Sequence, residues 1–140
     1  MSKPPIIVDT NILFSSLLRT ESYLFQSLFK NEHSFFVCEL VFIELFKHKE
    51  KLMRGTQLPE QDVVESLYIL MKRIQLFKEE LIGDSSWKRA YSLCQDIDEN
   101  DIPHVALTLE IQGLLWTGDK KLKKGLEQKG FDRFFHHELE

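Results

Sequence analysis

Short apolar runs alternate along this chain with longer stretches of helical periodicity. The runs Ile6–Val8, Phe35–Cys38 and Leu114–Trp116 carry no polar side chain, which is typical of parallel strands buried on both faces. Residues 74–77 are interpreted either as a short strand or as the end of the preceding helix, and residues 131–135 as a last strand. The alternation predicts an α/β fold over residues 1–140, a single domain whose central, mainly parallel sheet is flanked by helices.

Helices are expected between these strands wherever apolar residues recur three or four positions apart. Their expected starts are Thr10 or Asn11, Ser22, residue 40, Pro59, Asp84 or Ser85, Pro103, and the Lys-rich stretch after Asp119. The helix from residue 40 should continue to about residue 53 and end at Gly55. The inward faces are predicted to include Met71 in the helix after Pro59 and Tyr91 in the helix after Asp84.

Acidic residues stand at the edges of the apolar segments, where a fold seldom accepts them. Asp9 ends the first strand, Glu44 lies inside an apolar helix, and Asp119 follows the run that ends at Trp116. Asp98 and Asp101 precede another apolar helix. Burial of an ionised carboxylate is costly unless the charge is compensated. These acids therefore predict a shared pocket that holds a cation.

Each acid also has an ordinary structural interpretation. Asp9 and one of the pair Asp98 and Asp101 are suitable helix caps, and Asp119 is a suitable turn residue. Glu44 has Lys47 and His48 three and four residues ahead, the spacing of surface ion pairs on a helix. The shared site is favoured because the carboxyl ends of parallel strands meet at one edge of a sheet, which would bring Asp9 and Asp119 together.

Carboxylates gathered in one pocket repel one another, by about 4 kcal/mol for two charges 4 Å apart at an effective dielectric constant of 20. An oxygen-rich site without His or Cys ligands favours Mg²⁺ or Mn²⁺. His48 and His104 are interpreted as ordinary surface histidines. Such ions commonly serve phosphoryl chemistry, in which one orients and deprotonates water and a second stabilises the leaving oxygen.

The net charge of −4 disfavours a passive nucleic-acid coat protein, which would be basic. Basic residues nevertheless cluster at 47–54 and 120–124, beside the acidic segments. They are interpreted either as solvated helix faces or as a phosphate-binding rim, in which Lys47, Lys120 and Lys121 would contact the substrate.

The two cysteines, Cys38 and Cys94, are expected to be reduced core residues. The apolar runs are too short to span a membrane, and no signal-type segment opens the chain. We therefore expect a cytoplasmic protein.

Four segments together resemble the PIN-domain ribonucleases of the toxin type (VapC-like). They are Val8–Asn11, Glu44–Leu45, Asp98–Leu107 and Thr117–Lys120, in matching order and rough spacing over nearly the whole chain. The resemblance implies a Mg²⁺- or Mn²⁺-dependent endonuclease that hydrolyses single-stranded RNA. It also implies the role of toxin beside a small antitoxin protein. We further expect a homodimer.

The resemblance assigns the catalytic and metal-binding acids to Asp9, Glu44, Asp101 and Asp119. Asp98 precedes the helix and is kept as a candidate for an additional metal ligand from its loop. Asn11 and Thr117 match polar positions that would orient the carboxylates. A DNA-directed or structure-specific nuclease and a catalytically silent PIN-like protein-binding module are the alternatives. A phosphotransfer domain with an Asp-x-Asp motif is disfavoured because Asn11 stands where the second acid would act as general acid.

Overall fold

The computed structural model describes residues 3–18, 33–55 and 59–136. Four parallel strands, β1 (Ile6–Val8), β2 (Phe35–Cys38), β3 (Ile74–Phe77) and β4 (Leu114–Trp116), form one sheet in the order β3-β2-β1-β4. β1 is an inner strand of this sheet, since Ile6 pairs with Phe35 on one side and with Leu114 on the other. Residues 74–77, for which two interpretations were open, form the edge strand β3.

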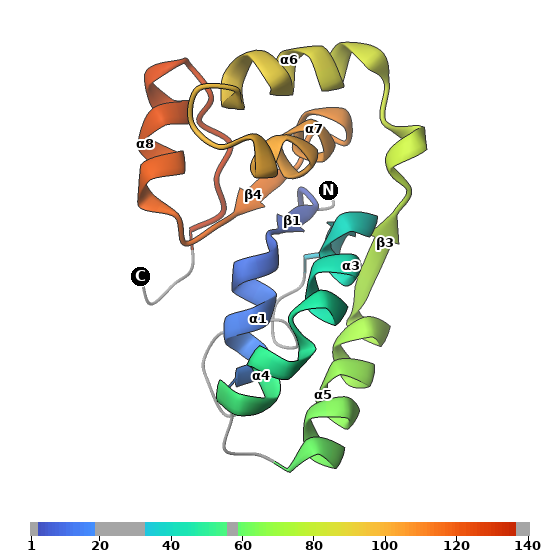
Figure 1. Ribbon diagram of the computed structural model, residues 1–140. Coiled ribbons are helices and arrows are strands. Elements are labelled where there is room, and N and C mark those ends of the chain that lie inside the picture. The colour runs from blue at the N-terminus through green and yellow to red at the C-terminus, as the bar shows by residue number, and fades with distance from the viewer. Residues whose placement is uncertain (1–2, 19–32, 56–58, 137–140) are drawn as a thin grey trace.

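Helices cover both faces of this sheet (Figure 1). One layer contains α1 (Thr10–Leu18), α3 (Glu39–Lys47), α4 (Lys49–Gly55) and α5 (Glu60–Arg73). The other contains α6 (Asp84–Cys94), α7 (Ile102–Glu110) and α8 (Lys120–Gln128). The short 3-10 helices η1 (Glu79–Leu81) and η2 (Glu99–Asp101) precede α6 and α7. The predicted α/β domain is thereby confirmed as a three-layer structure.

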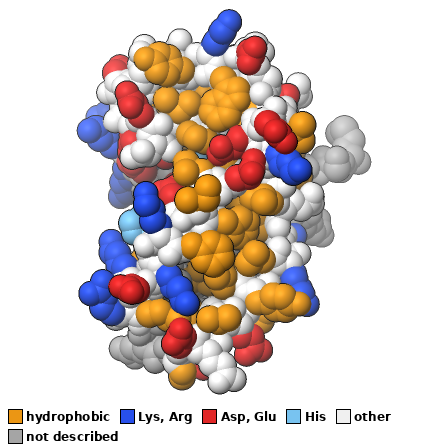
Figure 2. All heavy atoms as spheres, turned by 45° about the vertical axis from the view of Figure 1, so that its right-hand side comes forward, with side chains coloured by type: hydrophobic (Ala, Val, Ile, Leu, Met, Phe, Trp, Pro, Cys, Tyr) orange, Lys and Arg blue, Asp and Glu red, His pale blue; other side chains and the backbone are white. Residues whose placement is uncertain are grey.

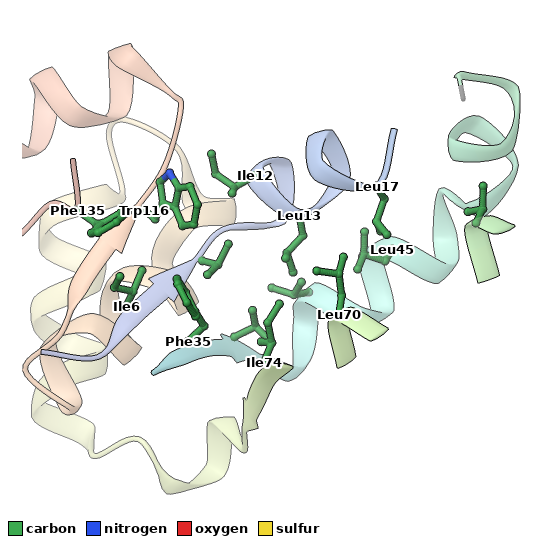
Figure 3. Packing of buried hydrophobic residues seen from close by; sticks show 14 residues of the cluster. Ile6, Ile12, Leu13, Leu17, Phe35, Leu45, Leu70, Ile74, Trp116 and Phe135 are labelled. Atoms are coloured by element: carbon green, nitrogen blue, oxygen red, sulfur yellow. The ribbon is translucent and has the colours of Figure 1, made fainter. Parts of the chain in front are cut away.

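Two hydrophobic cores lie on the two faces of the sheet. Alternate residues of β1 separate between them, because successive side chains of a strand point in opposite directions. Ile6 and Val8 pack with Trp116 against α1, α3 and α5 (Figure 3), whereas Ile7 packs with Leu115 against α6, α7 and α8. The apolar character of the strand runs follows from this burial on both sides.

Several expected elements differ from the structure. The helix expected over residues 40–53 is divided at His48 into α3 and α4. Residues 131–135 form no strand, and only an isolated bridge joins Phe134 to Leu115. Met71 and Tyr91, predicted to face inward, are exposed. The helix expected from Ser22 lies outside the described residues.

Both cysteines are buried and free, as predicted. Burial raises the pKa of each thiol to about 12, so neither is a reactive thiolate near neutral pH. Within the described residues, no helix is long and apolar enough to cross a membrane.

Candidate metal centre

A small polar pocket of about 150 Å³ opens at the carboxyl ends of β1 and β4. It gathers five acidic side chains from segments that are far apart in the sequence. The residues that line it are Asp9, Thr10, Asn11, Glu44, Asp98, Asn100, Asp101, His104 and Asp119. Every acid selected from the sequence therefore lies at this one place, at the edge of the sheet where parallel strands present ligand sites.

Asp98, Asp101 and Asp119 form the tightest group in the pocket. One carboxylate oxygen from each lies within 4.8 Å of those of the other two, which is close enough for one cation to contact all three. Asp98 directly precedes η2, Asp101 is the last residue of η2, and Asp119 belongs to the loop after β4. The geometry places Asp98 beside Asp101 and not as an alternative to it.

Asp9 is buried and both caps a helix and faces the pocket. Its Oδ1 accepts a hydrogen bond from the backbone N–H of Ile12 at 2.9 Å, at the start of α1. The Thr117 hydroxyl also hydrogen bonds to this carboxylate, while its oxygen accepts from the Asp119 N–H at 3.1 Å. Burial raises the pKa of Asp9, and these hydrogen bonds oppose that rise. Thr117 thus couples the orientations of the two acids.

Asp98 and Asp119 are oriented by the backbone in the same way. Asp119 Oδ1 accepts from the Leu122 N–H at 3.0 Å and caps α8. Asp98 Oδ1 accepts from the Asn100 N–H at 3.0 Å and caps η2. A cap fixes one carboxylate oxygen and with it the direction of the other. The capping and metal-binding interpretations are therefore compatible.

Glu44 reaches the pocket from α3 and accepts a hydrogen bond from the Thr10 hydroxyl at 3.1 Å. Among the described residues, no ion pair joins it to Lys47 or His48. Thr10 was considered only as a helix cap, and its part in holding Glu44 was missed. Its position next to Asp9, in the first turn of α1, was the one available signal.

Among the acids of the pocket, Asp101 has the largest shift in pKa. Burial, followed by repulsion from Asp98, Asp9, Asp119 and Glu44, raises the pKa of its carboxyl to about 7. A group with this pKa retains a proton near neutral pH in part of the molecules and loses it when a cation binds. An all-oxygen donor set under mutual repulsion fits a hard divalent ion such as Mg²⁺ or Mn²⁺.

The interpretation of His104 as a surface histidine is wrong. The residue is 3% exposed and lines the pocket, because it lies on the inner side of α7. Burial lowers its pKa to about 4, so the imidazole is neutral at pH 7. Its Nδ1 has no hydrogen-bond partner among the described residues. His48, in contrast, is exposed.

The remaining predicted site residues lie outside or at the rim of the pocket. Asn11 is exposed and contributes to the lining. Lys47, Lys120 and Lys121 are exposed and do not belong to the lining, although Lys120 and Lys121 directly follow Asp119 in the first turn of α8. Their contact with a substrate stays a prediction.

Solved structures with the same fold include two of low sequence identity. One is VapBC2 from Rickettsia felis bound to a DNA fragment from their promoter, at a TM-score of 0.63 and 16% identity, covering 85% of this chain and 91% of that one. The other is PAE2754 from Pyrobaculum aerophilum, at a TM-score of 0.62 and 12% identity, covering 90% of this chain and 86% of that one. A search of curated proteins finds no match.

The sequence pattern that defines the PIN domain matches residues 7–138, which is nearly the entire chain. The match includes every acid of the pocket and, except for Ile6, all residues of the four strands. This chain therefore belongs to the PIN domain family.

Proposed function

We propose that this PIN domain is a Mg²⁺- or Mn²⁺-dependent endoribonuclease that hydrolyses phosphodiester bonds of single-stranded RNA. The observation that supports this proposal is that five acids line one pocket, namely Asp9, Glu44, Asp98, Asp101 and Asp119. Repulsion in such a cluster is unfavourable unless a cation relieves it. A domain that served only for protein binding would gain nothing from this repulsion among its carboxylates. The cluster therefore favours an enzyme over a catalytically silent module.

The acids have distinct parts in this proposal. Asp98, Asp101 and Asp119 would hold a cation, since their oxygens lie closest together. Asp9 and Glu44 line the same pocket and would complete the ligand set directly or through water. Divalent ions supply a lowered pKa for water and neutralise charge on a phosphate. Thr117 and Thr10 hold Asp9 and Glu44 in place through their hydroxyl groups.

The first test is the metal requirement and the chemistry of the cleaved ends. Purified protein should cleave single-stranded RNA when Mg²⁺ or Mn²⁺ is added and stop in EDTA. The ends should be a 5′-phosphate and a 3′-hydroxyl, because in the proposed reaction an activated water attacks the phosphorus in line and the 3′-oxygen leaves and takes up a proton. End-labelled RNA resolved on a gel, with and without phosphatase, measures both. Cleavage in EDTA that leaves 2′,3′-cyclic phosphates would rule out the metal mechanism, and preferential cleavage of DNA would shift the substrate class.

We further propose that the nuclease is the toxin of a toxin–antitoxin pair in the cytoplasm. The similarity to the VapBC2 structure supports this role at the level of fold. A small protein encoded next to this chain should then co-purify with it and suppress RNA cleavage. Co-expression of the neighbouring reading frame, followed by the cleavage assay, examines the proposal.

The expected homodimer would bury an apolar face formed by Ile43 and Phe46 of α3, Tyr68 of α5 and Leu76 of β3. All four side chains are exposed, and Figure 2 shows hydrophobic side chains gathered on this side of the molecule. Strand β3 is one of the two edge strands of the described sheet, and an edge presents unpaired N–H and C=O groups. This edge and its apolar surroundings favour a second copy as the occupant.

Charge favours an antiparallel approach of two such edges. Lys72 precedes β3, and Glu79 and Glu80 follow it. Two antiparallel copies would therefore place opposite charges against each other at both ends of the interface.

Phe46→Glu should convert the dimer to a monomer, because it places a charge in the centre of the buried face. Light scattering after gel filtration measures the mass, and Arg89→Glu on α6 is a control that changes an exposed residue elsewhere. A monomeric wild-type protein, or a dimer that survives Phe46→Glu, would contradict this interface.

A further inference from the structure

A second, larger hollow of about 490 Å³ lies on α6 and at the start of α7. It is lined by Trp87, Lys88, Tyr91, Ser92 and Ile102. Tyr91 is 52% exposed and Trp87 is half-buried, so both rings are accessible from solvent. We refer to these five residues as the aromatic groove. We propose that the aromatic groove stacks unpaired bases of the RNA strand whose phosphodiester bond occupies the metal centre; the inference rests on the proposed nuclease function.

The groove adjoins the metal centre through the backbone of one short segment. Ile102 lines the groove, and its neighbour Asp101 lines the metal pocket. The backbone N–H of Asp98 donates a hydrogen bond to the carbonyl of Cys94, the last residue of α6, at 2.9 Å. The last turn of α6, which carries Tyr91, therefore lies close to the acids. A strand leaving the metal centre would reach the groove first on this side.

The spacing of the aromatic residues suits a stacking surface. Trp87 and Tyr91 are four positions apart on α6, so their side chains leave the same face of the helix. Lys88 lines the same groove and is exposed. Aromatic rings that hold bases, next to a cation that holds phosphates, are the two elements by which proteins bind single strands without sequence preference.

Both ends of α6 are anchored, which keeps this surface in one position. At its start, Glu110 of α7 accepts hydrogen bonds from the Gly83 N–H and the Ser86 hydroxyl, both at 2.9 Å. At its end, Lys129 donates to the carbonyl of Leu93 at 2.9 Å and contacts the carboxylate of Asp96. Such anchoring favours binding, because a surface that is already held in place loses little conformational entropy when the ligand stacks on it.

The acidic charge of this protein makes contacts to the bases of the RNA a better source of affinity than contacts to its phosphates. The chain carries a net charge of −4, and the acids of the metal centre repel a polyanion before a cation binds. Stacking supplies affinity that does not depend on charge. Bases in a duplex are already stacked on one another, so the groove selects single strands. Figure 2 shows hydrophobic side chains at the α6 end of the molecule as well as on the dimer face.

Fluorescence of Trp87 tests the inference directly, because the other tryptophan, Trp116, is fully buried. Single-stranded RNA mixed rapidly with the protein in Mg²⁺ should quench Trp87 by stacking before it is cleaved, whereas the same sequence as a duplex should not. Tyr91→Ala should weaken the binding of the single strand at least about fivefold, the loss expected for one stacked base. Tyr91→Phe keeps the ring and should bind as the wild type does. Gln128→Ala, a truncation of an exposed, uncharged residue on α8 that belongs neither to the groove nor to the proposed dimer face, is the control.

The outcomes separate this inference from the proposed function. Stacking that depends on Tyr91, in a protein that cleaves no RNA with Mg²⁺ or Mn²⁺, would support the groove and refute the nuclease. Metal-dependent cleavage with no quenching of Trp87 and no effect of Tyr91→Ala would refute the groove and leave the nuclease standing. Equal quenching by RNA and by an oligonucleotide of abasic sites would overturn base stacking. A change in solution mass caused by Tyr91→Ala, with RNA binding unaltered, would identify the groove as a protein contact and overturn the inference.

Discussion

Asp119→Asn and Asp9→Asn should each reduce metal-dependent RNA cleavage by more than about 100-fold, the upper end of the loss when a ligand loses only its hydrogen-bond partner. Asparagine is nearly the same size as aspartate and keeps a side-chain oxygen. The cap that Asp119 provides to the Leu122 N–H, and that Asp9 provides to the Ile12 N–H, can therefore persist. The substitution removes the negative charge and one anionic oxygen, which are what a hard cation requires.

The matched control for these variants is Asp84→Asn. Asp84 is an exposed acid in the first turn of α6 and does not line the metal pocket. Initial cleavage rates with Mg²⁺ or Mn²⁺ should be unchanged in this variant, and circular dichroism should show that all three proteins are folded. Retention of wild-type rates by Asp119→Asn and Asp9→Asn would mean that these acids act only as helix caps.

Asp101→Asn should stabilise the metal-free protein at pH 8 and lose this advantage as the pH falls below about 7. The folded-state pKa of Asp101 is about 7, because the carboxyl is buried and faces four other acids. In the unfolded chain the pKa returns to about 3.9. Between these values the folded state binds more protons than the unfolded state. The contribution of Asp101 to stability is therefore most favourable below pH 4, declines through the interval from about 4 to 7, and remains unfavourable above 7.

Asparagine cannot ionise and resembles the protonated form of Asp101. The difference in free energy of unfolding between variant and wild type should grow with pH by at most about 1.4 kcal/mol per unit, the slope for one proton. Urea unfolding in EDTA at pH 5, 6, 7 and 8 measures this difference. Saturating Mg²⁺ should reverse it at pH 8, since the wild type then gains the binding energy of the ion. A difference that does not vary with pH would show that Asp101 is not under strain from its neighbours.

The sequence alone determined the class of fold and the acids that matter. A strand without polar residues is stable only when both of its faces are covered. The sequences of β1 and β4 therefore predict a parallel sheet between two layers of helices. Asp9 and Asp119 were recognisable because each directly follows such a strand or its short loop. The rule that parallel strands present their carboxyl ends at one edge then brought these two acids together.

Local patterns could not determine which side of a helix another element would cover. Helical periodicity placed Met71 and Tyr91 on inward faces, yet both are exposed because neighbouring elements pack against Leu70 and Ala90 instead. His104 was misplaced for the converse reason. It is a buried residue of α7 that lines the pocket. The sequence pattern does not reveal that a polar side chain is buried in this way.

The tertiary structure alone decided how the five acids are arranged in the pocket. The sequence favoured Asp101 as the ligand with Asp98 as an additional candidate, and the packing of η2 against α6 and α7 brings both to Asp119. It also decided that Asp101 has a pKa of about 7, since the shift depends on burial, on the charge of Asp98 in the same segment and on three charges from other segments. A sequence specifies which groups can ionise, but their free energies depend on distances and solvent exclusion, which exist only once the chain has folded.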